Sequence, residues 1–119
     1  TRKALPQTKI IVLEPFYFPI SKDDLSYRYT PHIECEPDTG RPDRDETQEA
    51  MDYKSAAIQL TRMAARRVAE EEADIFVPLY DLFAEKISKS KTEYFMWDGT
   101  HPSVAGHMLI AEQWLKTVK

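Results

Sequence analysis

Apolar residues gather in two short continuous runs, one near the start of the chain and one past its middle. Residues 9–13 (Lys-Ile-Ile-Val-Leu) and 74–80 (Asp-Ile-Phe-Val-Pro-Leu-Tyr) are rich in β-branched and aliphatic side chains, and a Glu-Pro pair ends the first run. Continuous apolar runs of this length are typical of strands buried on both faces, in the middle of a parallel sheet. We therefore predict two buried strands.

Between the two runs, apolar residues recur with a helical period. From about residue 45 to residue 72 they are spaced by four, three, four and four positions, which predicts one stripe turned toward the core: Tyr53, Ala57, Leu60, Ala64 and Val68. Acidic residues at positions 43, 45 and 46 suit the positive end of the helix dipole. A strand, a helix and a second strand in this order predict a unit of parallel type.

Two further helices are predicted toward the C-terminus. A short one covers residues 82–88, and the last runs from residue 103 to about 118, with Pro102 near its first turn, where a missing N–H costs least. Its core-facing side is predicted to carry Trp114 beside a stripe of other apolar residues: Val104, Met108, Ala111, Leu115 and Val118. The expected class is therefore α/β, with two parallel strands and about three helices.

Residues 19–44 are rich in Pro, Asp and Ser and show little periodicity, which predicts a long surface loop with a short helical turn around residues 23–27. Long loops inside compact domains are often functional, but the pattern assigns no role to residues 21–43. The single cysteine, Cys35, lies here between two glutamates. Neither an internal disulfide nor a multi-cysteine metal site is expected, only a free thiol.

Composition and charge limit the function classes. The 119 residues suffice for one small domain, and no apolar run approaches the roughly 20 residues of a membrane helix. A net charge of −4 gives no reason to expect a nucleic-acid partner. The one local basic group, Arg62, Arg66 and Arg67, is interpreted as a solvated helix face balanced by the acidic residues 70–72.

The first residues contain neither a starting Met nor the apolar stretch of a signal peptide. We therefore expect the chain to begin inside a longer polypeptide. On this interpretation the localisation stays open, since any targeting segment would lie in the preceding part.

An Asp and a His stand three residues apart near the C-terminus, at Asp98 and His101, with Gly99 between them. A histidine that removes a proton from a serine needs a carboxylate on its other ring nitrogen, which fixes the tautomer and stabilises the imidazolium. A turn containing glycine can bring Asp98 beneath His101. The spacing therefore indicates the base end of a catalytic triad, on a loop just before a helix.

The run over residues 97–107, Trp-Asp-Gly-Thr-His-Pro-Ser-Val-Ala-Gly-His, resembles the last motif of the SGNH or GDSL-type serine hydrolases, a family of esterases, lipases and carbohydrate deacetylases. Residues 106–115 resemble the helix that follows it in the family, residues 11–16 its fourth strand and residues 73–83 its fifth. The resemblance implies the C-terminal portion of a three-layer α/β/α, flavodoxin-like fold. Residues 1–119 would then form a single incomplete domain.

The resemblance implies that His101 is the general base and that Asp98 orients it. No nucleophile and no oxyanion hole carry over. The family's serine lies in a Gly-Asp-Ser motif, and none of this chain's three glycines is followed by Asp-Ser; the family's oxyanion hole uses a glycine and an asparagine, and this sequence has no asparagine. Among the serines, residues 21, 26 and 55 lack a strand-to-helix Gly turn, and Ser103 is too close in sequence to His101.

The expected function is serine ester hydrolysis without a metal or organic cofactor, on carbohydrate acetyl or short-chain acyl esters. This chain alone is expected to be inactive, since the serine and the oxyanion hole would come from a complementary N-terminal segment or a partner chain. The free edge of the first strand also calls for such a neighbour. Trp97, Phe16 and Tyr17 are candidates to contact the substrate, although core packing explains each of them equally well.

Two alternatives stay open. A noncatalytic hydrolase remnant that binds a partner through its strand edge and apolar helix faces would explain the missing serine and asparagine. A metal site of Asp98, His101 and His107 is the weaker alternative, because it offers only three ligands. His107 follows Gly106 inside the predicted helix, where packing or a hydrogen bond is the simpler role.

Overall fold

Two short strands and four helices make up the part of the chain that the computed structural model describes, residues 3–20 and 48–118. In chain order they are β1 (Ile11–Leu13), α1 (Gln48–Glu72), β2 (Ile75–Val77), α2 (Tyr80–Ser88), α3 (Thr92–Phe95) and α4 (Val104–Thr117). The predicted helices over 82–88 and 103–118 are confirmed as α2 and α4. The single-turn helix α3 was not predicted, since four residues are too few to show a period.

The two strands pair in parallel, with Ile11 opposite Ile75 and Leu13 opposite Val77. Because parallel strands need a long crossover, α1 provides the connection and confirms the predicted strand, helix and strand unit. Asp74 holds the start of β2 against the chain before β1: its backbone N–H donates to the carbonyl of Ile10 at 2.8 Å, and its carboxylate accepts from the Ile10 N–H at 2.8 Å.

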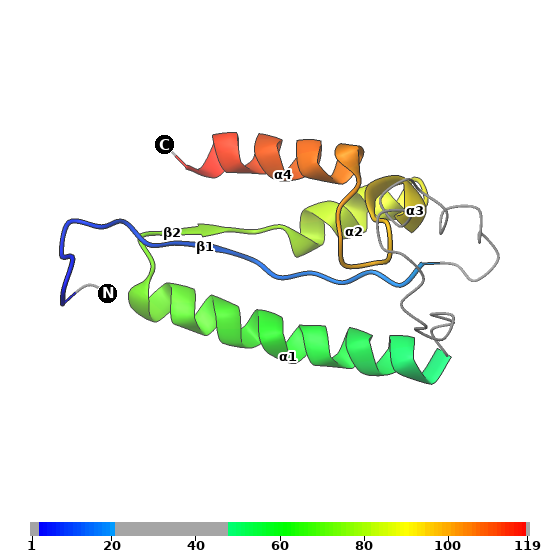
Figure 1. Cartoon of the computed structure of the whole chain (residues 1–119), viewed down its shortest axis with the longest axis horizontal. Helices are drawn as coiled ribbons and strands as arrows, with labels where there is room; N and C mark the ends of the chain where they lie inside the picture. Colours follow the sequence, from blue (N-terminus) through cyan, green and yellow to red (C-terminus); the bar gives the residue numbers. More distant parts are fainter. Residues whose placement is uncertain (1–2, 21–47, 119) are drawn as a thin grey trace, which may run out of the picture.

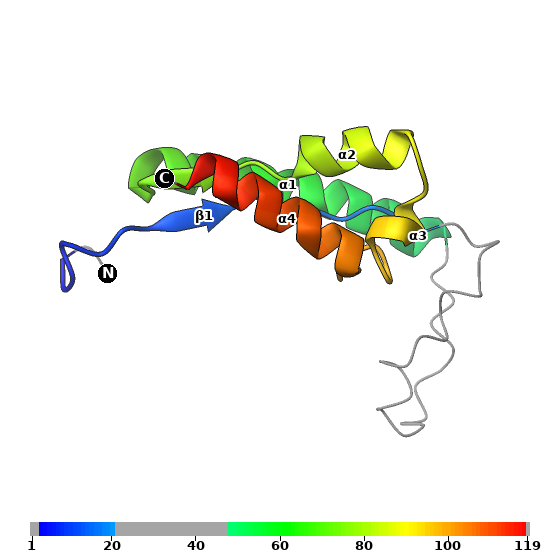
Figure 2. The same cartoon turned by 90° about the horizontal axis from the view of Figure 1, so that it is seen from above.

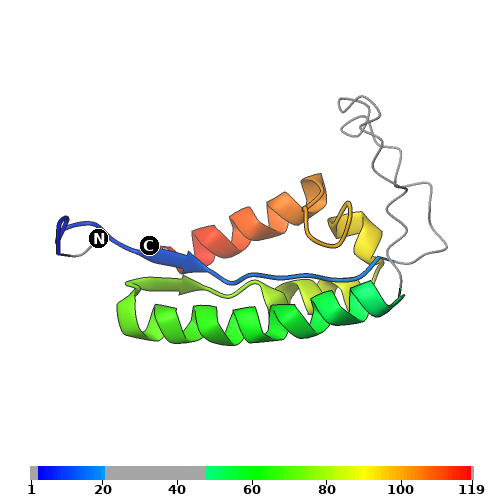
Figure 3. The same cartoon turned by 60° about the horizontal axis from the view of Figure 1, so that its bottom comes forward.

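The elements form three layers, with the strands between α1 on one face and α4 on the other (Figure 1). Seen from above, α4 lies over α1 (Figure 2), and the oblique view keeps the strands between them (Figure 3). The predicted partial α/β/α fold is confirmed. Helices α2 and α3 lie beyond the carboxyl ends of the strands, together with the turn that leads into α4 (Figure 1).

The core lies where β2, α2, α3 and the segment after β1 meet. Its most deeply buried side chains are Phe83, Leu79, Met96 and Val77, each at most 2% exposed. Aromatic rings gather around Phe83, because Phe16, Phe18 and Phe95 have ring centroids 4.7, 6.3 and 6.4 Å from it. This aromatic cluster joins the chain after β1 to α2 and α3.

The predicted inner stripe of α1 is wrong, because it faces away from the strands. Tyr53, Leu60 and Val68 are 75%, 70% and 52% exposed, and the side toward the strands carries Met51 and Ala69 instead. Arg62, on that inner side, forms an ion pair with the buried carboxylate of Glu14. A buried charge must be paired, so this requirement outweighs the burial of the apolar stripe and fixes the rotation of the helix.

The predicted core face of α4 is also largely wrong. Val104, Met108 and Leu115 are 74%, 67% and 74% exposed, whereas another side of the helix packs against the core through Ala105, Leu109, Ile110, Trp114 and Val118. Of the residues predicted for the core-facing side, Trp114 and Val118 are packed there. The helix carries two apolar stripes, and the one with Trp114 faces inward because the large indole buries more apolar area.

Both strands are shorter than predicted: each has three residues, and Tyr80, at the end of the predicted second strand, begins α2 instead. The first strand is also less buried than predicted. Leu13 is 40% exposed, and Ile11 and Val12 are half-buried. Within the described residues β1 pairs with a strand on one edge only, the edge next to β2. A central strand of a parallel sheet is paired on both edges and covered on both faces, so β1 is not in a central position here.

Some expectations concern residues outside the described part of the chain. They are the loop over 21–43 with its helical turn, Cys35, and the acidic residues before α1. In the described part, no helix is long and apolar enough to cross a bilayer.

Candidate functional site

Asp98 and His101 meet in a tight turn between α3 and α4. The imidazole Nδ1 of His101 lies 2.7 Å from Oδ2 of Asp98. The other carboxylate oxygen accepts the backbone N–H groups of Thr100 at 2.9 Å and His101 at 2.8 Å. An Asp side chain that binds its own backbone two and three residues on is a common turn device. The three-residue spacing thus brings the two side chains together as the sequence indicated.

The carboxyl of Asp98 is held in its ionised form. Burial raises its pKa, but the backbone N–H of His101, the His101 side chain and the Thr100 N–H together outweigh that effect, so the pKa lies below its ordinary value. An anion beside Nδ1 favours the tautomer that carries the proton there. Nε2 of His101 is then the basic nitrogen, and its side chain is 76% exposed.

Gly99 is required at its position in the turn. Its φ of +86° lies in the left-handed region, which L side chains rarely adopt. A Cβ there would stand 2.4 Å from the carbonyl oxygen of Phe18 and 2.9 Å from the ring of Tyr17. The Phe18 N–H also donates to the Gly99 carbonyl at 3.0 Å. The turn is therefore docked on the segment that follows β1.

A short antiparallel pairing closes the turn at its base. The N–H of Trp97 donates to the carbonyl of His101 at 2.8 Å, and Met96 pairs with Pro102 in an isolated bridge. The N–H of Ser103 then donates to the carbonyl of Phe95 at 2.8 Å. These bonds fix both ends of the segment, so Asp98 and His101 project from a closed loop.

Ser103 caps α4 and is committed to that role. Its hydroxyl donates to the carbonyl of Tyr94 at 2.6 Å and accepts the N–H of Gly106 at 3.2 Å, and the residue is 6% exposed. One turn later, Nδ1 of His107 lies 2.9 Å from the Ser103 carbonyl, the predicted hydrogen bond. Among residues 3–20 and 48–118, no three His, Cys, Asp or Glu side chains are grouped to hold a metal ion.

The three aromatic candidates for substrate contact lie in different surroundings. Tyr17 is 5% exposed, and its ring lies against Gly99. Burial raises the pKa of the Tyr17 hydroxyl, and the negative charge of Asp98 raises it further, so this ring is close to the Asp–His pair. Trp97 is half-buried beside the pair, whereas Phe16 packs on Phe83 of the core.

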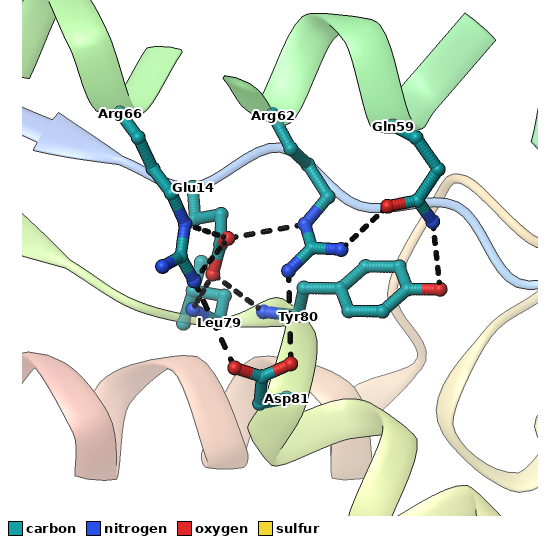
Figure 4. Close-up of polar contacts among 7 residues, drawn as sticks. All are labelled: Glu14, Gln59, Arg62, Arg66, Leu79, Tyr80 and Asp81. Atoms are coloured by element: carbon teal, nitrogen blue, oxygen red, sulfur yellow. Dashed lines mark hydrogen bonds and ion pairs between the residues drawn. The ribbon is translucent and has the colours of Figure 1, made fainter. Parts of the chain in front are cut away.

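Sequence reasoning missed a buried carboxylate, Glu14, which directly follows β1. Figure 4 shows it between two arginines of α1 and the first residues of α2. One oxygen accepts Nε of Arg62 at 3.1 Å and Nε of Arg66 at 3.0 Å. The other accepts the backbone N–H groups of Leu79 and Tyr80, both at 3.0 Å. Burial raises the pKa of Glu14, but these four donors outweigh it and lower the pKa overall.

The interpretation of the basic group as a solvated face is wrong for Arg62, and Arg66 is exposed, at 44%, but is balanced by Glu14 and not by the acidic residues 70–72. The side chain of Arg62 is only 14% exposed, and both Arg62 and Arg66 pair with Glu14. Arg67 does behave as expected, on the surface and 3.0 Å from Glu71. The signal in the sequence was a Glu next to an apolar run, together with two arginines four residues apart on one helix face.

A family model for GDSL-like lipases and acylhydrolases matches residues 3–114. The chain belongs to this family. It is 36% identical over 53 residues to an acetylxylan esterase of Geobacillus stearothermophilus, a stretch that covers 44% of the chain and 24% of the esterase. The resemblance inferred from the sequence is confirmed.

A solved structure agrees with the fold as well. The crystal structure of a GDSL-like lipase from Parabacteroides merdae aligns with a TM-score of 0.66 and 25% identity, over 98% of this chain and 42% of that protein. This GDSL-family chain therefore spans less than half the length of either relative.

Proposed function

We propose that His101 is the general base of a serine ester hydrolase and that Asp98 orients it. The observation that carries the proposal is the 2.7 Å contact between His101 Nδ1 and Asp98 Oδ2, in a chain of the GDSL-like lipase and acylhydrolase family. Within the described residues Nε2 of His101 makes no hydrogen bond, and the side chain is exposed. A base needs its reactive nitrogen accessible to the nucleophile.

In the proposed reaction a serine hydroxyl attacks the ester carbonyl while Nε2 of His101 takes the hydroxyl proton. The Asp98 carboxylate stabilises the imidazolium that forms. The proton then passes to the leaving alkoxide oxygen, which departs as an alcohol and leaves an acyl-serine. Water, deprotonated by the same imidazole, attacks that acyl group and releases the acid. Neither step needs a metal or an organic cofactor.

The serine and the oxyanion donors would come from a complementary segment, either N-terminal to this chain or on a partner chain. Three surface features support such a neighbour: the edge of β1 that no described strand pairs with, and the exposed apolar stripes of α1 and α4. Contiguous apolar surface on a folded protein commonly marks a contact with another segment or chain. The crystal structure of the lipase relative, of which this chain covers 42%, is long enough to include such a segment.

For the substrate we propose an ester with a small acyl group, either a carbohydrate acetate or a short-chain acyl ester. The acetylxylan esterase relative supports the acetate first. We call this chain together with its complementary segment the assembled hydrolase. Its rates on acetylated xylan and on p-nitrophenyl esters of increasing chain length distinguish the two substrates. A preference for long acyl chains would contradict this part of the proposal.

The central test is His101→Ala in the assembled hydrolase, with His107→Ala as the matched control. The base variant is expected to lose on the order of 10³-fold or more in kcat on p-nitrophenyl acetate, and the control is expected to keep the wild-type rate. If both variants retain full activity, the assignment of His101 fails. The noncatalytic-module alternative then gains support if the intact mass of the purified protein also shows no accompanying Gly-Asp-Ser segment.

A further inference from the structure

The buried carboxylate of Glu14 acts as a helix cap supplied from another element. The N-cap residue of α2 is Leu79, whose side chain makes no capping hydrogen bond. The first N–H groups of a helix lack partners within it, and here Glu14 Oε2 accepts those of Leu79 and Tyr80. These two hydrogen bonds connect the start of α2 to the residue that follows β1. Glu14 is only 1% exposed, so its carboxylate is held in the interior at this junction.

The same cluster immobilises the side chain of Tyr80. The guanidinium of Arg62 lies 3.5 Å from the centre of the Tyr80 ring, and Nε2 of Gln59 donates to its hydroxyl at 3.1 Å. The Gln59 carbonyl oxygen in turn accepts from Arg62 at 2.7 Å. Figure 4 shows these contacts converging on the ring from α1. Glu14, which orients Arg62, therefore also determines where the Tyr80 ring lies.

Tyr80 leads directly to the turn that holds the Asp–His pair. The ring of Phe18 stacks on it at 4.8 Å with an interplanar angle of 26°. The Phe18 backbone N–H donates to the carbonyl of Gly99, and the space where a Gly99 Cβ would stand is filled by the Phe18 carbonyl. Gly99 stands between Asp98 and His101, so any shift of Phe18 shifts the turn.

We propose that Glu14, with Arg62 and Arg66, is a positioning residue for the Asp98–His101 pair and acts through Tyr80 and Phe18. The inference rests on the proposed function, in which the pair is the base end of the catalytic site. Reaction rates are sensitive to small displacements of such groups, since a misplacement of about 1 Å can cost on the order of a hundredfold. A carboxylate outside the reacting atoms thus contributes to the rate through geometry.

The test compares Glu14→Gln with Glu71→Gln in the assembled hydrolase. Glu71 is the matched control because it also accepts from an α1 arginine, Arg67, but on the surface. Glu14→Gln is expected to lower the hydrogen-exchange protection of the Phe18 amide about tenfold and kcat on p-nitrophenyl acetate about tenfold to a hundredfold, with KM little changed. The pKa of Asp98, followed by ¹³C NMR, is expected to rise toward its ordinary value of about 3.9 as its N–H donors loosen. Glu71→Gln is expected to change none of the three.

A folded Glu14→Gln protein with wild-type Phe18 protection and an unchanged Asp98 pKa would overturn the inference and leave Glu14 a purely structural role. If Glu14→Gln does not fold, Tyr80 supplies the decision. Tyr80→Leu removes the ring and is expected to reproduce both NMR changes, whereas Tyr80→Phe keeps the ring and is expected to match the wild type; equal spectra for the two variants overturn the inference. The NMR measurements need no turnover, so they are independent of the activity test of His101.

Discussion

The carboxylate of Asp98 holds His101 at two points: Oδ1 accepts its backbone N–H at 2.8 Å, and Oδ2 lies 2.7 Å from its imidazole Nδ1. One side chain thus orders both the main chain and the ring of the histidine. The arrangement needs only three residues of sequence separation, which explains why a short motif can build it. The orientation of the turn is set by its contacts with the Phe18 backbone and the Tyr17 ring, which lie against Gly99.

Replacement of Asp98 by Asn tests whether the charge matters beyond the shape. An Asn oxygen can still accept the backbone N–H, but its NH₂ group would face Nδ1 and favour the tautomer with the proton on Nε2. We expect Asp98→Asn to lower kcat of the assembled hydrolase by about 10³ to 10⁴-fold, as for other triads with this change. Initial rates of p-nitrophenyl acetate hydrolysis measure it. Glu112→Gln, at a side chain 66% exposed on α4, is the control and should keep the rate; a wild-type rate for Asp98→Asn would contradict the prediction.

Gly99→Ala should destabilise the protein. The new Cβ would meet the Phe18 carbonyl oxygen at 2.4 Å, and the backbone φ of +86° is unfavourable for alanine. We expect a loss of about 1–3 kcal/mol in the free energy of unfolding, measured by urea denaturation. Thr100→Ala, at the exposed next residue, should stay within about 0.5 kcal/mol of wild type. Equal stability of the two variants would argue against the close approach of Phe18 to the turn.

Stability should fall in acid through Glu14 and Asp98. Both carboxyls have pKa values below their ordinary ones in the folded protein. The unfolded chain therefore takes up protons first, below about pH 4.3, and the stabilisation is lost as the pH falls further through the lowered folded-state values. We expect the free energy of unfolding to decline steeply below about pH 4.3, and less steeply in Glu14→Gln. Urea titrations between pH 7 and pH 2.5 give both slopes, and identical slopes would refute the contribution of Glu14.

The observed rotation of α1, which leaves Leu60 exposed, predicts that truncating Leu60 costs much less stability than truncating a buried ring. Phe83→Ala removes a fully buried ring and should cost about 3–5 kcal/mol in the free energy of unfolding of this chain. Leu60→Ala, at a side chain 70% exposed, should cost less than about 0.5 kcal/mol. Phe83 lies in α2, so its truncation sets the scale for a buried side chain, and chemical denaturation of Leu60→Ala decides between the rotations. A large cost for Leu60→Ala in the isolated chain would mean that the stripe packs inward, as its periodicity had suggested.

The features that could be predicted from the sequence are those that local pattern determines. The apolar run ending at Glu14 marked a strand, and the spacing of Asp98 and His101 marked a turn. The rotation of α1 could not be predicted, because it depends on the pairing of Arg62 and Arg66 with a carboxylate 48 and 52 residues away. Periodicity reports that a helix has an apolar stripe, but not which side another part of the chain covers.

The free edge of β1 gives the last prediction. In a parallel pair the N–H and C=O of one residue point to the same side, and alternate residues point to opposite sides. The Ile10 carbonyl accepts the N–H groups of Asp74 and Ile75 at the start of β2, and the Glu14 N–H donates to the carbonyl of Val77. The amides of Ile11 and Leu13, which alternate with these residues, therefore point away from β2. Pro15, which has no N–H, would end further pairing on that edge.

If a complementary strand completes the sheet in the assembled hydrolase, the amides of Ile11 and Leu13 should be protected from hydrogen exchange there and exposed in the chain alone. The Glu14 amide, bonded to Val77 in either case, is the internal control. Exchange followed by NMR in the two samples measures the difference at each residue. Fast exchange of Ile11 and Leu13 in the active assembly, with Glu14 protected, would mean that the missing serine arrives without a strand on this edge, because only an unpaired edge leaves those two amides open to water.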